Sequence, residues 1–167
     1  MLDRVGKVIG INTQILSSSG SNAGIGFSIP INIAKRVVPD LIEHGHYEYS
    51  YLGIQGMDLR PKVAESRGLT PITRGVIVGA VVDGSPADLA GLIPNTEIFD
   101  LKGVRLPGGG DLIISADGTD IEKMSDLLSY LFHNTRPGDK ISLGLIHDDG
   151  NESIVDVALV ARPESNS

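Results

Sequence analysis

The spacing of glycine and proline constrains this fold more than any other feature of the sequence. The chain has 21 glycines and nine prolines, and they fall between short apolar runs rich in valine and isoleucine. Glycine and proline interrupt helices and mark turns, whereas β-branched residues favour strands. The pattern predicts β structure with many turns. Four tyrosines and three phenylalanines are present without any tryptophan, so we expect an aliphatic core.

Composition argues against several classes of partner and chemistry. The net charge of −7 disfavours nucleic acid and anionic membranes, because both need basic patches. No apolar run approaches the roughly 20 residues that span a bilayer, so we expect no membrane insertion in this segment. The absence of cysteine excludes disulfides and thiolate chemistry. The length suits one domain, or one domain plus part of another.

Residues 1–46 are expected to form two strands and a helix. The strands are Lys7–Ile15 and Gly24–Ile29, joined by a serine-rich loop at Ser17–Ser21. Pro30 leads into the helix, and Gly45 is predicted to cap its C-terminal end. The apolar residues of this helix recur at helical spacing and are Ile33, Val37, Val38, Leu41 and Ile42. This segment is too short to build a stable core alone, so we interpret it as a remnant of a larger domain.

Residues 47–163 have the pattern of a compact α+β module, followed by a short tail at 164–167. Ser85 is a predicted N-cap and Pro86 the first residue of a short helix that ends near Gly91. The turn at Asp148–Asn151 predicts a hairpin. The expected strands are Tyr51–Leu59, Gly75–Val82, Asp111–Ala116, Lys140–His147 and Ser153–Val160, and the other helical segments are Val63–Gly68 and Met124–Asn134. We expect a partly open β-barrel capped by two helices.

One connection, at about residues 93–110, is longer than a tight turn requires. It contains a possible small hairpin, in which Thr96–Phe99 pairs with Val104–Leu106 around Lys102-Gly103. Long connections in compact domains are often functional, although an inert surface excursion is an equal alternative. Its glycines at Gly108–Gly110 lack the Lys-Ser/Thr of a phosphate-binding loop, and no helix follows them.

The tetrapeptide Tyr51-Leu52-Gly53-Ile54 is the strongest candidate for a binding loop. Glycine can adopt backbone conformations that are closed to other residues, so consecutive N–H groups can converge on an anion. Such a loop can hold the terminal carboxylate of a peptide while the following strand edge pairs with the peptide backbone. An ordinary strand entry is the alternative for these four residues alone.

Histidine-based chemistry is not expected. The four histidines are His44, His46, His133 and His147. His44 and His46 lie at a helix end without an identifiable third ligand, so we predict neither a metal nor any other cofactor. Ser28, His133 and Asp111 could be assembled into a triad on paper, but nothing around them is typical of a nucleophile elbow or an oxyanion hole.

Taken in order, several stretches resemble the C-terminal part of HtrA/Deg serine proteases, which are trypsin-like enzymes that carry PDZ domains. The matching stretches are GKVIGINTQI, GIGFSIPIN, YLGI, GSPADLAGL, GDLIISADGTDI and RPGDKISLGLIHDDG. They run in the family's order from Gly6 to Gly150 and cover nearly the whole chain. The long connection before Gly110 is similar to a variant of some bacterial and archaeal members.

The resemblance implies that residues 1–46 are the last strands and helix of a trypsin-like β-barrel domain. In this family the nucleophilic serine lies in a Gly-Asn-Ser-Gly-Gly motif, and the chain begins at Met1, just past that position. The triad histidine and aspartate lie further upstream in the family. We therefore expect no catalytic residue in this chain and no peptide hydrolysis by it. The substrate-facing strand would survive as Asn12, Thr13, Gln14 and Ile15.

The resemblance also implies that residues 47–163 form a PDZ domain, whose groove lies between the strand after Ile54 and the helix from Met124. Leu127 is expected to face the core, whereas Met124 and Leu128 face the groove, although plain core packing remains the alternative for each leucine. The predicted peptide-binding residues are Tyr51, Leu52, Gly53, Ile54, Gln55, Met124, Leu128 and Leu131.

The expected function is therefore recognition of extended peptides or protein C-termini with hydrophobic ends, which tethers substrates to a protease or regulates it in protein quality control. The protease domain of the parent chain is the other expected partner. Two alternatives stay open: a stand-alone PDZ scaffold or adaptor, and one segment of an assembled, active serine protease. The family suggests a periplasmic or other extracytoplasmic location in a prokaryote. A monomer is expected, because the family's trimer contacts come mainly from the protease domain.

Overall fold

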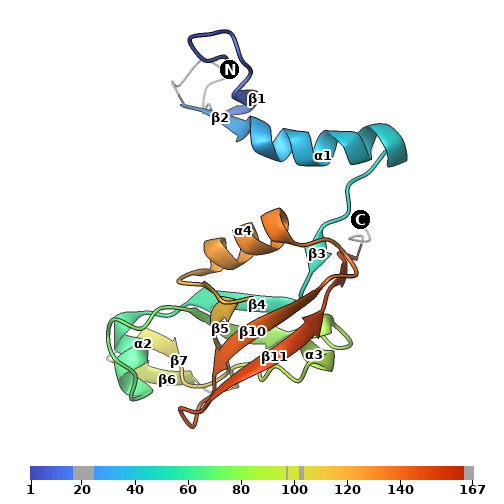
Figure 1. The fold of residues 1–167 in the computed structure, drawn as a ribbon. Coiled ribbons are helices and arrows are strands. Elements are labelled where there is room, and N and C mark those ends of the chain that lie inside the picture. Colours follow the sequence, from blue (N-terminus) through green and yellow to red (C-terminus); the bar gives the residue numbers. More distant parts are fainter. Residues whose placement is uncertain (17–24, 97, 102–103, 164–167) are drawn as a thin grey trace. The chain divides into compact units, whose positions relative to one another are not determined.

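The computed structural model describes residues 1–16, 25–96, 98–101 and 104–163, which divide into two compact units, Met1–Tyr47 and Glu48–Ser167 (Figure 1). Each unit is described by itself. The predicted loop at Ser17–Ser21, the predicted turn at Lys102-Gly103 and the tail at 164–167 lie outside the described residues.

The first unit is a two-stranded antiparallel sheet followed by a helix. Strand β1 (Gly10–Leu16) pairs with β2 (Ile25–Pro30), and helix α1 spans Ile31–His44. Gly45 caps the helix in the left-handed conformation, with φ 77°, and donates its N–H to Leu41 O at 3.1 Å, which confirms the predicted cap.

The first strand begins later than the predicted Lys7. Asp3 turns the chain back, because its carboxylate accepts the N–H groups of Val5 and Lys7 at 2.9 and 2.8 Å. Regular pairing therefore starts only at Gly10. Ala34 is the one buried hydrophobic side chain among the described residues of this unit, so these residues build almost no core of their own.

The second unit is built on an open antiparallel sheet. The strand order is β11-β10-β8-β5-β4, with β9 paired to β8. The predicted α+β class is confirmed, and the sheet does not close into a barrel. The strands are β4 (Ile54–Asp58), β5 (Val76–Val81), β8 (Leu112–Ala116), β9 (Thr119–Asp120), β10 (Lys140–Ile146) and β11 (Glu152–Ala158). Strand β9 is too short to carry a sequence pattern and was not predicted.

The described residues of this unit also form the helices α2 (Pro61–Ser66), α3 (Pro86–Leu89) and α4 (Met124–Asn134). Ser85 caps α3 by accepting the Asp88 N–H at 3.4 Å, as predicted. Asp58, at the end of β4, accepts the N–H of Met124 at 2.8 Å. This bond fixes the start of α4 beside β4 and supplies a carboxylate where the helix dipole favours one.

The core is aliphatic, as predicted, because none of the buried hydrophobic side chains among the described residues is aromatic. The larger cluster lies between the sheet and α4 and includes Ile113, Leu127 and Leu143, each with 0% exposure. The smaller cluster joins α2 to the other part of the sheet through Val63 and Leu112. Burying each such side chain contributes about 1.5–3 kcal/mol, so these clusters hold β4 and α4 in place.

Two small sheets complete this unit. Strand β6 (Ile98–Leu101) pairs with β7 (Val104–Pro107), so the predicted hairpin in the long connection is present with its first strand shifted toward the C-terminus. Strand β3 (Ser50–Tyr51) pairs with β12 (Val160–Ala161). The prediction of one strand from Ser153 to Val160 was wrong, because the chain leaves β10 after Ala158 and pairs with β3 instead.

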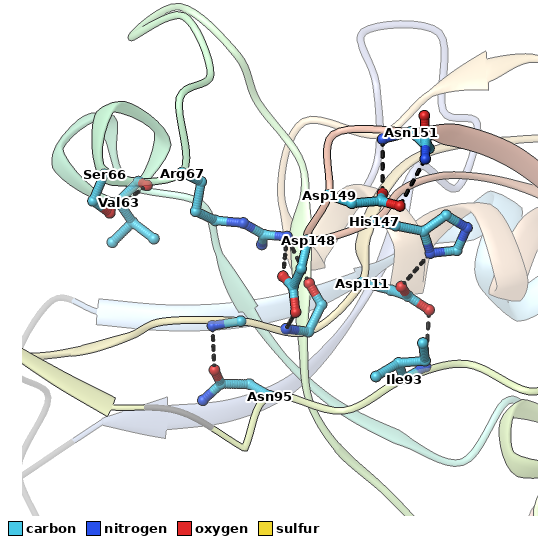
Figure 2. Close-up of polar contacts among 12 residues, drawn as sticks. Val63, Ser66, Arg67, Ile93, Asn95, Asp111, His147, Asp148, Asp149 and Asn151 are labelled. Carbon is cyan, nitrogen blue, oxygen red and sulfur yellow. Dashed lines mark hydrogen bonds and ion pairs between the residues drawn. The ribbon is translucent and has the colours of Figure 1, made fainter.

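Polar contacts anchor both ends of the long connection, as Figure 2 shows. The Asp111 carboxylate accepts the Ile93 N–H at 2.8 Å, and its other oxygen lies 2.6 Å from His147 Nδ1. Arg67 Nη2 donates to Gly110 O at 2.8 Å and to the Asp148 carboxylate at 2.7 Å. These contacts tie the base of the connection to α2 and to the turn after β10.

Candidate functional site

Strand structure is interrupted at Leu52-Gly53, between β3 and β4, so the prediction of one continuous strand Tyr51–Leu59 was wrong. Gly53 has φ 87°, a conformation that favours glycine. A Cβ placed there would overlap the side chain of Ser85, which follows β5. Both the backbone conformation and the close approach therefore require glycine, and together they turn the chain into a loop.

The carbonyl groups of this loop are hydrogen-bonded, whereas two of its N–H groups are not. Leu52 O accepts the Ala87 N–H and Gly53 O accepts the Val82 N–H, each at 2.9 Å. The N–H groups of Leu52 and Gly53 donate to no described residue, although both residues are buried. Buried N–H groups without an acceptor are costly, so these two donors are suited to an acceptor from outside the chain.

Strand β4 follows directly, and among the described strands it lies at the edge of the sheet and pairs with β5 alone. Val82 donates to Gly53 O, so this pair takes a hydrogen-bonding position of the ladder although it forms that single bond, and the alternation of antiparallel ladders makes Ile54 and Val81 a non-hydrogen-bonded pair. The N–H and C=O of Ile54 therefore point to the open side of β4. The open edge of β4 therefore begins at Ile54, directly after the unpaired N–H groups of Leu52 and Gly53.

A pocket of about 390 Å³ lies along this edge and is lined on its other side by residues of α4. It is lined by Tyr49, Ser50, Tyr51, Leu52, Gly53, Ile54, Met124, Leu127, Leu128, Leu131, Phe132 and Arg162. Leu128 is 54% exposed and stands at the mouth, whereas Leu127 is fully buried beneath it. This lining is mostly apolar and suits a hydrophobic side chain.

Most of the predicted binding residues meet at this pocket. The exception is Gln55, which is exposed and does not line it. The structure brings together Tyr51, Leu52, Gly53, Ile54, Met124, Leu128 and Leu131. Leu127 lies in the core, as expected, and also forms part of the pocket wall. Asn12 and Thr13 lie on β1 in the other unit, as does the backbone of Gln14 and Ile15.

Four lining residues were missed from sequence, namely Tyr49, Ser50, Phe132 and Arg162. Arg162 reaches the pocket because its N–H donates to Tyr49 O at 2.9 Å, which extends the pairing of β12 with β3. Thr135 Oγ1 donates to Ser50 Oγ at 2.8 Å and joins β3 to the end of α4. Only Phe132 carried a usable signal, because it follows Leu131 on an amphipathic helix.

A second polar cluster lies away from this pocket. Asp111, His147 and Ser153 form a hydrogen-bonded chain, with 2.7 Å between His147 Nε2 and Ser153 Oγ. Asp111 thus contacts His147 and not His133, with which it was combined in the hypothetical Ser28-His133-Asp111 triad. The second carboxylate oxygen of Asp111 accepts the Ile93 N–H. We therefore infer that these hydrogen-bonded side chains anchor the long connection. The described part of the chain holds no group of His, Asp or Glu residues arranged for a metal.

Among the described residues, no helix has the length and apolar character that crossing a membrane demands. The site is thus an open strand edge, a helix and an apolar pocket, closed at one end by a loop with two free N–H donors. This arrangement is typical of domains that take up an extended peptide as an additional strand. The family model for the PDZ domain matches residues 50–159, and the chain belongs to that family.

Relatives of known identity carry the same segment within longer proteins. A probable periplasmic serine endoprotease DegP-like from Bartonella henselae is 34% identical over 99% of this chain and 29% of its own length. The periplasmic pH-dependent serine endoprotease DegQ of Escherichia coli is 32% identical over 100% of this chain and 33% of its own length. The chain thus spans about a third of the curated relatives it matches.

Solved structures of HtrA-type proteases are also similar to this chain. The HtrA-type protease AlgW with decapeptide is 34% identical, with a TM-score of 0.72 over 96% of this chain and 44% of that chain. The HtrA-type protease AlgW with tripeptide is 33% identical, with a TM-score of 0.77 over 99% of this chain and 49% of that chain. Both likenesses extend beyond the PDZ domain into the first unit.

Proposed function

We propose that this chain binds extended peptides by their C-terminal ends. The peptide adds as a strand to the open edge of β4, and its last side chain enters the apolar pocket under α4. The terminal carboxylate accepts the N–H groups of Leu52 and Gly53. Hydrophobic terminal residues fit this pocket best, because its walls are mostly aliphatic.

The two free N–H groups carry this proposal. They are buried, they lack an acceptor among the described residues, and they lie where the edge of β4 meets the pocket. A carboxylate has two negatively charged oxygens and can accept from both donors at once. The similar AlgW structures contain a decapeptide or a tripeptide, which supports peptides as the ligand class.

We further propose that the chain works as the peptide-binding part of an HtrA/Deg-like serine endoprotease in the periplasm. Residues 1–46 would be the last strands and helix of its trypsin-like domain, with Asn12, Thr13, Gln14 and Ile15 on the substrate-facing strand. The similarity to DegP-like and DegQ proteases over 99–100% of the chain supports this. Peptide binding would then tether substrates to the protease or bias it toward its active state.

Titration of a fluorescein-labelled peptide that ends in leucine tests the binding mode. Anisotropy should show saturable binding, and the same peptide extended by two glycines should bind about tenfold more weakly because its carboxylate is displaced from the loop donors. Placing N-methyl groups along the peptide backbone should also weaken binding, since strand addition uses the backbone N–H groups. Equal binding of the extended peptide would overturn recognition of the C-terminus.

Two further measurements separate the alternatives. A peptide library should show broad preference for hydrophobic C-termini, whereas one narrow, tight motif would favour a scaffold or adaptor. The isolated chain should not cleave casein, because the proposed triad residues belong to other parts of the protease. Casein cleavage that a serine-directed inhibitor blocks would contradict this and favour an active assembled protease.

A further inference from the structure

Among the described residues that line the pocket, Arg162 alone carries a permanent formal charge, and none is aspartate, glutamate or lysine. This is unexpected from composition, since the whole chain has a net charge of −7. The positive charge of Arg162 lies in the wall of the proposed groove. Its sign is the one that suits a carboxylate.

The backbone holds Arg162 opposite Tyr49, at the start of the segment that leads through β3 to the loop. Arg162 follows β12, which pairs with β3, and its N–H donates to Tyr49 O at 2.9 Å. Pro163 comes next and restricts Arg162 to extended backbone conformations. Arg162 therefore lies opposite Tyr49, just before β3, and its side chain forms part of the pocket wall.

The guanidinium of Arg162 is available to a ligand. It is exposed and forms no hydrogen bond or ion pair with any described residue. Arg67 shows the contrast, because its guanidinium is 5% exposed and is engaged by Asp148 and Gly110 O. Arg162 thus has its donor groups free in the wall of the same pocket that Leu52 and Gly53 line.

We infer that Arg162 is a specificity-determining residue that makes the groove prefer a free terminal carboxylate over a neutral chain end. This inference rests on the proposed peptide binding. Backbone N–H groups donate to either a carboxylate or an amide oxygen, whereas a guanidinium gains charge attraction only from the carboxylate. Arg162 therefore adds discrimination between chain ends that the loop donors supply only weakly.

A cycle of two proteins and two peptides tests this inference. The whole chain and its Arg162→Gln variant are titrated with a fluorescein-labelled peptide ending in leucine, as the free acid and as the C-terminal amide. Arg162→Gln should weaken binding of the free acid about three- to fivefold, as for an exposed ion pair, and change binding of the amide less than about twofold. Raising the salt concentration should shrink the preference in the parent chain but not in the variant.

Two variants control for general effects. Lys62→Gln removes one positive charge from an exposed position on α2 that does not line the pocket, and it should leave both affinities unchanged. Arg162→Lys keeps the charge and should retain most of the preference for the free acid. Thermal unfolding of each variant should match the parent chain, because the Arg162 side chain forms no hydrogen bond or ion pair with a described residue.

The outcomes distinguish this inference from the proposed function. If Arg162→Gln weakens both peptides equally, or neither, Arg162 does not read the charge and the inference is overturned while peptide binding stands. If the parent chain binds acid and amide equally well, the inference again fails alone. If the parent chain binds neither peptide, the proposed function fails and this inference fails with it.

Discussion

Gly53 lies directly against Ser85, so closely that a side chain on Gly53 would overlap the Ser85 side chain. Ser85 Oγ also donates to Gly53 O at 3.4 Å. The same Ser85 Oγ caps α3 by accepting the Asp88 N–H. Ser85 therefore connects the binding loop to the first turn of a helix. This contact restricts the shape of the loop, whose Leu52 and Gly53 both line the pocket.

Substituting Gly53→Ala should destabilise the chain and abolish peptide binding. The added methyl group meets Ser85 and is also forced into a left-handed backbone conformation, for a combined cost of about 3 kcal/mol. Urea unfolding measures this cost. Gly84→Ala is the matched control, because Gly84 has φ 71° but open space around it, so only about 1 kcal/mol of backbone strain is expected. Equal costs for the two variants would show that Ser85 does not restrict the loop.

Substituting Leu128→Glu should weaken binding of a peptide that ends in leucine by about tenfold, because a charge at the mouth of the pocket disfavours an apolar side chain. Stability should change by less than about 0.5 kcal/mol, since Leu128 is 54% exposed. Leu89→Glu introduces the same charge at an 82% exposed leucine of α3 that does not line the pocket, and binding should persist. Anisotropy titrations of both variants test whether the face of α4 that carries Leu128 binds the peptide. Equal affinities for the two variants would contradict this.

Tyr130 should ionise at unusually high pH. Burial, a 2.6 Å hydrogen bond from its hydroxyl to Asp117 and the negative charge of Asp117 together raise its pKa from 10.0 to about 12. Since the folded pKa lies above the unfolded one, the stability from this contact is fully present below pH 10.0 and is lost as the pH rises through about 12.

Ultraviolet titration of tyrosinate absorbance checks this expectation. One of the four tyrosines should titrate late, and Tyr130→Phe should remove that late phase. Asp117→Asn should bring the phase to lower pH, because the charge of Asp117 is lost. A single transition near pH 10.0 for all four tyrosines would contradict the contact.

Substituting Asp111→Ala should release the base of the long connection. Asp111 is 1% exposed, and its removal leaves the Ile93 N–H and His147 without their acceptor. We expect a loss of about 2–3 kcal/mol in the free energy of unfolding, measured in urea. Asp149→Ala, in the exposed turn after β10, should cost much less. Peptide binding at saturation should survive both substitutions, because neither residue lines the pocket.

Local patterns predicted most of this architecture. Ser85-Pro86 marked the start of α3, Gly45 the end of α1, and apolar spacing the buried face of α4 at Leu127. Each of these signals acts over a few residues, so the sequence alone carries it.

Long-range pairing accounts for what the sequence did not predict. Residues 50–51 and 160–161 are far apart in the chain and too short to have a periodicity, so β3, β12 and the position of Arg162 could not be predicted. The break at Gly53 depends on contact with Ser85, which is also distant in sequence. The binding loop was recognisable by its glycine, but its shape and its charged neighbour depend on the fold.

The most direct test of the account is nuclear magnetic resonance of the ¹⁵N-labelled chain during titration with a free-acid peptide that ends in leucine. If the terminal carboxylate binds this loop, the amide protons of Leu52 and Gly53 should shift strongly downfield and exchange more slowly with solvent, and the amide of Ile54 should gain protection as the peptide pairs with β4. Peptide-induced shifts confined to other parts of the chain, with the Leu52 and Gly53 amides unchanged at saturation, would contradict the account.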